Sequence, residues 1–202
     1  MRKDYQIFFD YIKPNSKVLD IGCGDGDFLQ KLKLEKNTKS YGIEISSEKV
    51  AECLNKGLSV INGDAEEELK FYPSTLDAPE PFDYAVLANT LQVMKNPKVI
   101  IEQAKRISKN LLISIPNFGY FENRLYIGLK GKMPMSKQLS YKWYETPNIH
   151  FSTILDFIEL LKELNLEIKK SFYIKDSAEV KPFKPFFPYI ANLTGKEAVF
   201  VI

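Results

Sequence analysis

An alternation of short apolar runs with helical patterns constrains the fold of this chain more than any other feature. Mostly apolar runs that end at glycine, proline or polar residues occur at residues 17–21, 40–45, 58–61, 82–88 and 111–115. Apolar residues at helical spacing follow the first, second and fourth of these runs. Nearly continuous apolar strands that alternate with helices are typical of a parallel sheet covered on both faces. We therefore expect a doubly wound α/β core.

The C-terminal part adds two strands, at residues 166–174 and 198–202, with no helical pattern between them. Strands connected in this way pair as an antiparallel hairpin. An amphipathic helix begins at about Thr153, after an irregular stretch at 117–151. The complete prediction is an α/β fold with a doubly wound, mostly parallel seven-stranded sheet and a C-terminal antiparallel hairpin.

The length of 202 residues predicts a single domain over residues 1–202. Within it, residues 117–150 form an insertion expected to cover the ligand site or to dock a partner. The segment 175–197 contains a run of prolines and aromatic residues at 181–189, and it is expected to be an extended loop because each proline removes a backbone donor and fixes φ.

Composition excludes several classes of protein. The 28 Lys and Arg nearly balance 26 Asp and Glu, so the strong positive charge of a nucleic-acid binder is absent. One histidine, His150, and two cysteines, Cys23 and Cys53, cannot supply a structural zinc site, and we expect no metal. No apolar run is long enough for a membrane span or a secretory signal, which predicts a cytoplasmic protein that contacts no membrane.

A glycine-rich turn at residues 20–26, with the pattern Asp-x-Gly-x-Gly-x-Gly, joins the first strand to the first helix. Ligands of open α/β sheets bind at such strand ends. The dinucleotide fingerprint G-x-G-x-x-G requires glycine at position 27, where Asp27 stands. Asp25 and Asp27 would also repel a pyrophosphate at the helix N-terminus. A nicotinamide dinucleotide is therefore a poor candidate ligand, whereas a cationic ligand suits this turn.

The turn resembles motif I of class I S-adenosylmethionine (SAM)-dependent methyltransferases, whose fold is Rossmann-like. This resemblance implies that Glu44, at the end of the second strand, accepts both ribose hydroxyls. It places Asp64 on the adenine amino group and the Ala65 backbone N–H on the adenine ring. Asn89 follows the fourth strand, in the segment that faces the methionine end of SAM. The residues implied to bind SAM or S-adenosylhomocysteine (SAH) are Asp20, Gly22, Cys23, Gly24, Glu44, Ile45, Asp64, Ala65 and Asn89.

Structural alternatives exist for several of these residues. The glycine turn could be purely structural, and Glu44 could be a solvated strand end. Asp64 could cap a short helix at 66–69. Cys23 is expected to pack inside the turn rather than act as a nucleophile, because no histidine lies near it in the motif, and Cys53 is expected in the core.

Longer runs resemble the methionine-biosynthesis protein family MetW from about residue 14 to residue 174. The most specific are Ser-Ile-Pro-Asn-Phe-Gly at 114–119, Gly-Lys-Met-Pro at 131–134 and the run from Trp143 to His150. The resemblance implies a role in methionine synthesis in partnership with a homoserine O-acyltransferase. Residues 175–202 fall outside it.

Two functions follow, and the sequence leaves both open. The first is a SAM-binding protein that acts with or regulates a homoserine O-acyltransferase, with 117–150 and the Pro-rich loop as docking segments. The alternative is a SAM-dependent methyltransferase for a small-molecule acceptor, with 117–150 as its lid. His150 is the only histidine, and it is expected to be structural or part of a partner surface, so no catalytic base is assigned and enzymatic activity is left undecided.

Overall fold

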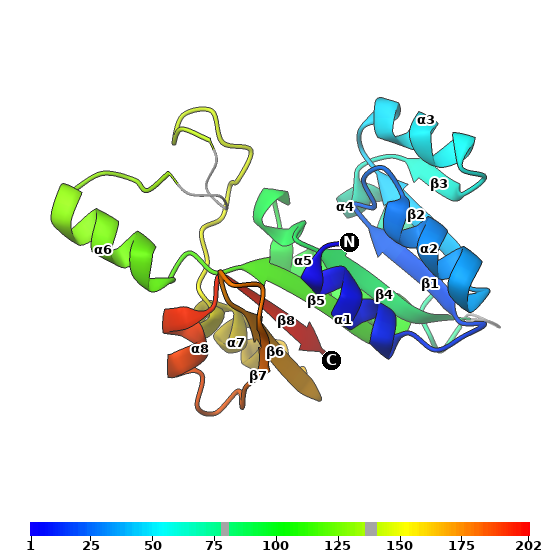
Figure 1. The fold of residues 1–202 in the computed structure, drawn as a ribbon. Coiled ribbons are helices and arrows are strands. Elements are labelled where there is room, and N and C mark those ends of the chain that lie inside the picture. The colour runs from blue at the N-terminus through cyan, green and yellow to red at the C-terminus, as the bar shows by residue number, and fades with distance from the viewer. Residues whose placement is uncertain (78–80, 136–140) are drawn as a thin grey trace.

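The computed structural model describes residues 1–77, 81–135 and 141–202, and its centre is one eight-stranded sheet (Figure 1). The strands are β1 (Lys17–Ile21), β2 (Lys39–Glu44), β3 (Ser59–Asn62), β4 (Phe82–Ala88), β5 (Ser108–Pro116), β6 (Lys170–Ile174), β7 (Val180–Pro182) and β8 (Glu197–Val201). Their order is β3-β2-β1-β4-β5-β8-β6-β7. β1 to β5 are parallel, and β8 lies antiparallel between β5 and β6.

Helices cover both faces of the sheet. The helices of the described residues are α1 (Lys3–Tyr11), α2 (Asp27–Lys36), α3 (Ser47–Asn55), α4 (Ala65–Glu68), α5 (Pro97–Ile107), α6 (Phe121–Lys130), α7 (Ile154–Glu163) and α8 (Tyr189–Thr194), with short 3-10 helices η1 (Leu69–Phe71) and η2 (Leu91–Val93). One core cluster joins α1 and α2 to the sheet, and a larger one joins α4, α5, α7 and α8 to the other face. α7 begins with a capping box between Thr153 and Asp156, close to the predicted start.

The alternation of side chains along the strands positions the site. On the α1 face of the sheet, the core uses Val18, Val86, Leu112 and Val199. Alternate residues of a strand point to the same face of the sheet. Two residues nearer the carboxyl ends of the parallel strands, this face carries polar residues on three strands: Asp20, Ser114 and Glu197. β8 runs antiparallel and contributes Glu197 from its start, opposite Pro116. The core therefore ends in a polar layer at the edge where ligands of such folds bind.

The structure confirms the predicted fold class, including the antiparallel pairing of β6 with β8. It adds one strand to the seven expected. Residues 175–197 are not entirely an extended loop, because β7 pairs with β6 and α8 follows. Pro182 is accommodated because β7 is the edge strand, where a missing N–H costs no ladder bond.

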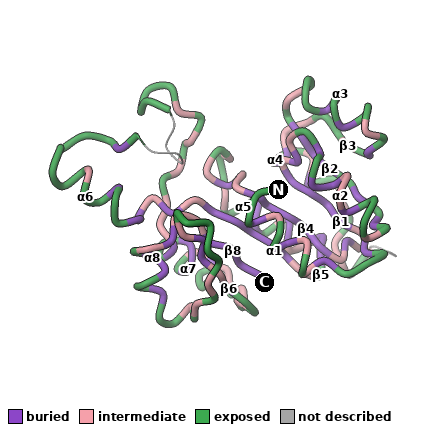
Figure 2. Tube along the Cα trace, in the orientation of Figure 1, coloured by how far each residue is buried: buried purple, intermediate pink, exposed green. Residues whose placement is uncertain are grey.

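The sequence pattern did not predict α1 or α6. In α1 the signal is present, since Tyr5, Phe8, Phe9 and Ile12 follow helical spacing, and Phe8 and Ile12 are fully buried. α6 lies inside the stretch expected to be irregular, and its large apolar residues are mostly exposed. It stands apart from the sheet beyond the end of β5, as the green segment in Figure 1 and the exposed colouring in Figure 2 show. Residues 136–140 of the predicted insertion lie outside the described residues.

Candidate ligand-binding site

A cleft of about 1010 Å³ opens at the carboxyl ends of β1, β2 and β4, within the size range of small-molecule sites. All of the predicted cofactor residues except Asp20 line it: Gly22, Cys23, Gly24, Glu44, Ile45, Asp64, Ala65 and Asn89. Strand order explains the convergence, because β3, β2, β1 and β4 are neighbours and their carboxyl ends meet at one edge. The structure thus brings together residues that are far apart in the sequence.

The glycine turn forms the floor of this cleft. Gly22, Gly24 and Gly26 have φ values of 79°, 58° and 77°, a region that residues with side chains rarely adopt. A Cβ at Gly22 would lie 2.5 Å from Cγ2 of Thr90, and one at Gly26 would lie 2.7 Å from Sγ of Cys53. The turn therefore requires glycine for both conformation and space.

Glu44 forms the wall beside the turn, and its carboxylate is held from two sides. Oε2 accepts a hydrogen bond from the Gly24 N–H at 2.9 Å, and Oε1 accepts one from the Ser46 N–H at 2.9 Å. Glu44 is buried, yet it lines the cleft. The side chain is not a solvated strand end, because it is 7% exposed and backbone N–H groups fix both carboxylate oxygens at the cleft.

Asp64 caps α4 and also faces the cleft. Its Oδ1 accepts the Glu66 N–H at 3.0 Å, as the structural alternative predicted, and its Oδ2 lies 3.7 Å from Nζ of Lys95. The cap occupies only one carboxylate oxygen. Oδ2 is within ion-pair range of Lys95 but accepts no hydrogen bond from the described residues, so its lone pairs suit a ligand donor such as an exocyclic amine.

Of the two acids of the turn, Asp27 is paired with a lysine. Lys56 reaches Asp27 Oδ1 at 2.6 Å and the Asp25 carbonyl at 2.7 Å. Asp25 itself accepts the Asp27 N–H at 3.1 Å. The helix N-terminus is therefore already occupied by carboxylates, which disfavours a pyrophosphate there.

Asp20 lies beneath the turn and has no exposed surface. Both of its carboxylate oxygens lack a hydrogen-bond partner in the described residues, and so do Oδ1 of Asn89 and Oγ1 of Thr90. Burial raises the pKa of Asp20 to about 7, assisted by the nearby Asp4 and Glu44 and opposed by Arg2. This end of the cleft is rich in acceptors and short of donors.

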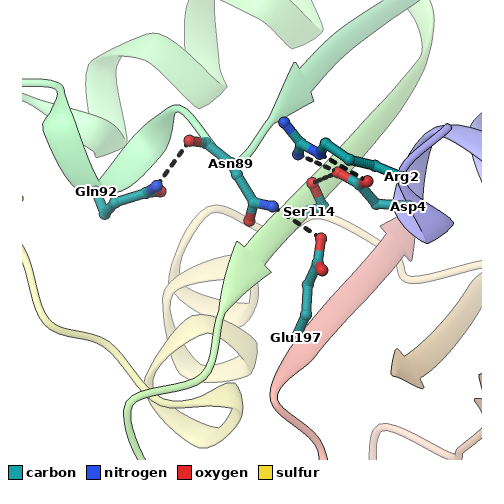
Figure 3. A network of polar contacts seen from close by, with 6 residues as sticks. All are labelled: Arg2, Asp4, Asn89, Gln92, Ser114 and Glu197. Atoms are coloured by element: carbon teal, nitrogen blue, oxygen red, sulfur yellow. Dashed lines mark hydrogen bonds and ion pairs between the residues drawn. The ribbon is translucent and has the colours of Figure 1, made fainter. Parts of the chain in front are cut away.

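A network of polar contacts crosses this end of the cleft from α1 to β8 (Figure 3). Arg2 Nε donates to Asp4 Oδ1 at 3.1 Å, Nη2 contacts the second oxygen, and Ser114 Oγ donates to Asp4 at 2.8 Å. Asn89 Nδ2 donates to Glu197 Oε1 at 2.8 Å. Burial raises the pKa of Glu197 to about 8, with a further contribution from Asp4. Acids thus outnumber the single cation, Arg2.

These shifts predict a pH-dependent stability. Because the pKa of Asp20 is about 7 in the folded protein and about 4 in an unfolded chain, folded Asp20 retains a proton that the unfolded chain has already released between these values. We expect the unfolding temperature of the ligand-free protein to fall by at least about 3 °C between pH 5 and pH 8. Thermal scans of Asp20→Asn and Glu197→Gln should show a smaller fall. If the unfolding temperature of both variants falls with pH as steeply as that of the unchanged protein, the raised pKa values of Asp20 and Glu197 are contradicted.

Cys23 packs inside the turn, and His150 lies outside the lining of the cleft. Cys23 is 2% exposed, and burial raises the pKa of its thiol, so it is a packed residue in the turn. Cys53 is fully buried, as predicted. His150 does not line the cleft. It borders a separate cavity of about 260 Å³, and its Nε2 lies 3.3 Å from the Lys95 carbonyl oxygen.

Three residues of the N-terminal region line the cleft although no motif pointed to them: Met1, Arg2 and Tyr5. Helix α1, which contains Tyr5 and begins directly after Arg2, could have been found from its apolar spacing. Their place at the cleft could not, because it depends on how α1 packs against the sheet.

The family model for methionine biosynthesis protein MetW matches residues 2–202. The chain belongs to the MetW family. A bifunctional methionine biosynthesis protein MetXA/MetW from Rhodopirellula baltica is 30% identical over 179 residues, which cover 84% of this chain and 28% of that protein. The chain therefore spans little more than a quarter of the length of this relative.

Solved structures of SAM-dependent methyltransferases share the fold. A possible histamine N-methyltransferase from Thermotoga maritima has a TM-score of 0.68 at 21% identity, covering 98% of this chain and 86% of its own. A plantazolicin methyltransferase in complex with SAH has a TM-score of 0.62 at 17% identity, covering 99% and 80%. At these identities the likeness establishes the class I methyltransferase fold and not an activity.

Two further observations concern the described residues only. None of their helices is long and apolar enough to cross a membrane. They contain no group of three or more His, Cys, Asp or Glu side chains placed to hold a metal ion.

Proposed function

We propose that the cleft binds SAM or SAH. The carboxylate of Glu44, held over the glycine turn, fits a ribose with two neighbouring hydroxyl donors. Oδ2 of Asp64 and the backbone of Ala65 suit an adenine at the β3 side of the cleft. The acid-rich end near Asn89 suits a sulfonium and an ammonium. SAM-dependent methyltransferases with this fold, one of them solved with SAH, support the proposal.

We further propose that this ligand-binding protein acts with a homoserine O-acyltransferase in methionine synthesis. The observation that carries this proposal is the relative that joins MetXA and MetW in one chain. When two proteins are fused in one chain, each is held at a high local concentration near the other. Two separate chains need an interface to achieve the same proximity. Family membership and the resemblance of residues 114–150 agree with such a role.

α6 and the aromatic pair Trp143 and Tyr144 supply exposed apolar side chains of the kind that an interface requires. Leu125 and Leu129 lie one helical turn apart and are 56% and 77% exposed. Trp143 and Tyr144 form an exposed aromatic pair with ring centroids 5.5 Å apart. Leucines and aromatic residues that a monomer leaves in water are typical of protein interfaces. Arg124 and Lys130 add positive charge to this helix.

Affinity capture from the native cell tests the partnership. We expect the tagged chain to retain a homoserine O-acyltransferase, identified by mass spectrometry, and the double variant Leu125→Asp, Leu129→Asp to retain at least about ten-fold less. The matched control is Leu34→Asp with Leu54→Asp, two exposed leucines on α2 and α3, at the other end of the molecule (Figure 1). Absence of the acyltransferase from the unchanged chain would contradict the partnership. Equal loss in both double variants would contradict the role of α6.

Methyl transfer to a small acceptor is the second candidate function. It is favoured by the cavity of about 260 Å³ that shares η2 with the main cleft and lies beside Gln92 and His150. In such a reaction the protein mainly positions two reactants, since the sulfonium supplies the leaving group. Production of SAH by the purified chain with an acceptor, in the absence of an acyltransferase, would favour this function.

A further inference from the structure

Residues 89–95, which we call the β4 wall, follow β4 and form one side of the cleft. Five of them line the cleft: Asn89, Thr90, Val93, Met94 and Lys95. Asn89 has a φ of 56°, in the left-handed region that residues with side chains rarely adopt. Thr90 lies against the glycine turn, since a Cβ at Gly22 would meet its Cγ2. A ligand in the cleft therefore contacts the β4 wall directly.

The β4 wall also holds residues 149 and 150, through Gln92, which does not line the cleft. The Gln92 carbonyl accepts hydrogen bonds from the N–H groups of Ile149 and His150 at 2.8 and 3.0 Å. Nε2 of Gln92 donates to the Asn89 carbonyl at 2.6 Å, a bond that Figure 3 shows. Gln92 thus connects a residue of the cleft to the segment behind the wall.

The bonds to Gln92 determine how an exposed aromatic pair is placed. Among the described residues, the hydrogen bonds and ring contacts of residues 141–148 stay within that stretch, and no ion pair joins it to the rest of the chain. The stretch carries Trp143 and Tyr144, which are 72% and 61% exposed. The position of this pair therefore depends on the attachment of Ile149 and His150 to the β4 wall.

The β4 wall contains polar atoms whose environment a ligand can change. Oδ1 of Asn89, Oγ1 of Thr90 and Oε1 of Gln92 are buried and have no hydrogen-bond partner among the described residues. A buried acceptor without a donor is unfavourable, and a ligand donor that reaches Asn89 or Thr90 relieves this cost. A ligand that binds one arrangement of the wall better than another shifts the wall toward that arrangement.

We propose that the β4 wall couples the cleft to residues 141–150, so that SAM or SAH fixes the position of Trp143 and Tyr144 and strengthens binding of the protein partner. This inference rests on the proposed ligand and partner and adds the regulation of one by the other. Aromatic side chains that are already held in place lose less conformational freedom on docking, which raises affinity. Because such coupling is reciprocal, the partner raises the affinity for SAH by the same factor.

The fluorescence of Trp143 tests the coupling without the partner. Trp143 is the single tryptophan of the chain and does not line the cleft, so its signal reports on residues 141–150. We expect saturating SAH to raise its steady-state anisotropy at least about 1.2-fold, with a midpoint equal to the dissociation constant from calorimetry. Ile149→Pro removes one N–H donor to Gln92 and should lose at least about half of this response, with SAH affinity within about two-fold.

Ile149→Ala is the matched control, because it removes the same exposed side chain and keeps the N–H. Its anisotropy response should equal that of the unchanged protein. An anisotropy that does not change when SAH binds would overturn the inference, and so would equal responses in Ile149→Pro and Ile149→Ala. Absence of SAH binding in calorimetry would instead contradict the proposed ligand.

A binding measurement with the homoserine O-acyltransferase tests the consequence for the partner. We expect saturating SAH to raise its affinity for the unchanged chain and for Ile149→Ala at least about five-fold, and for Ile149→Pro less than about two-fold. Equal affinity of the unchanged chain with and without SAH would overturn the regulation. Absence of any binding would contradict the proposed partnership, whereas the fluorescence result does not depend on the partner.

Discussion

Replacing Glu44 by alanine is expected to weaken SAM binding at least about 100-fold, because two hydrogen bonds from ribose hydroxyls to a carboxylate are lost together. The loss extends beyond the ribose. Glu44 also accepts the Gly24 and Ser46 N–H groups, so its removal loosens the turn that forms the floor of the cleft. Titration calorimetry with SAM and SAH measures the effect.

Two further variants separate these contributions. Glu44→Gln retains the shape of the side chain and one acceptor oxygen. We expect its SAM affinity to lie between that of the unchanged protein and that of Glu44→Ala. Glu52→Ala removes an exposed carboxylate from α3 and should leave the affinity unchanged. If Glu44→Ala binds SAM as tightly as Glu52→Ala does, Glu44 does not hold the ribose.

Asn117→Ala is expected to destabilise the fold by about 3–5 kcal/mol. Asn117 is 2% exposed. Its Nδ2 donates to the carbonyls of Asn192 and Gly195 at 2.8 and 2.7 Å, and its Oδ1 accepts the N–H groups of Gly119 and Ile154 at 3.1 and 3.3 Å. Alanine leaves several of these buried groups unpaired, at about 1–3 kcal/mol each. Denaturant unfolding gives the free energy directly.

Asn117→Asp separates the acceptor bonds of this side chain from its donor bonds. It keeps both acceptor bonds and faces the carbonyls of Asn192 and Gly195 with an oxygen, so it should also destabilise the protein strongly. Asn148→Ala is the control. Asn148 also lies within the predicted insertion 117–150, and its side chain makes no hydrogen bond among the described residues. It should change the free energy of unfolding by less than about 0.5 kcal/mol. A similarly small change in the free energy of unfolding of Asn117→Ala would show that the hydrogen bonds of Asn117 do not stabilise the fold.

The parallel core could be predicted from the sequence because its information is local. The apolar runs of β1, β2 and β4, each followed by a helical pattern, define strands and crossovers without reference to distant residues. The same locality made the glycine turn and Glu44 recognisable, since both occur at predicted strand ends. Sheet order then brings these motifs together in the cleft.

The part of the site that escaped prediction depends on contacts between distant segments. Glu197 reaches Asn89 because β8 inserts between β5 and β6, a placement that no local pattern encodes. Arg2 reaches the cleft because Asp4 pairs with Ser114, more than a hundred residues away in the chain. α6 escaped for a different reason: its apolar residues face solvent, so its pattern lacks the buried stripe from which helices are predicted.

Equilibrium dialysis of the unchanged protein with isotopically labelled SAM tests the central claim most directly. We expect one SAM bound per chain, displaced by SAH and retained in the presence of excess NADH or ATP, because Asp25 and Asp27 disfavour phosphates at the turn. A protein that retains no SAM, or that releases it to NADH or ATP as readily as to SAH, would contradict the account.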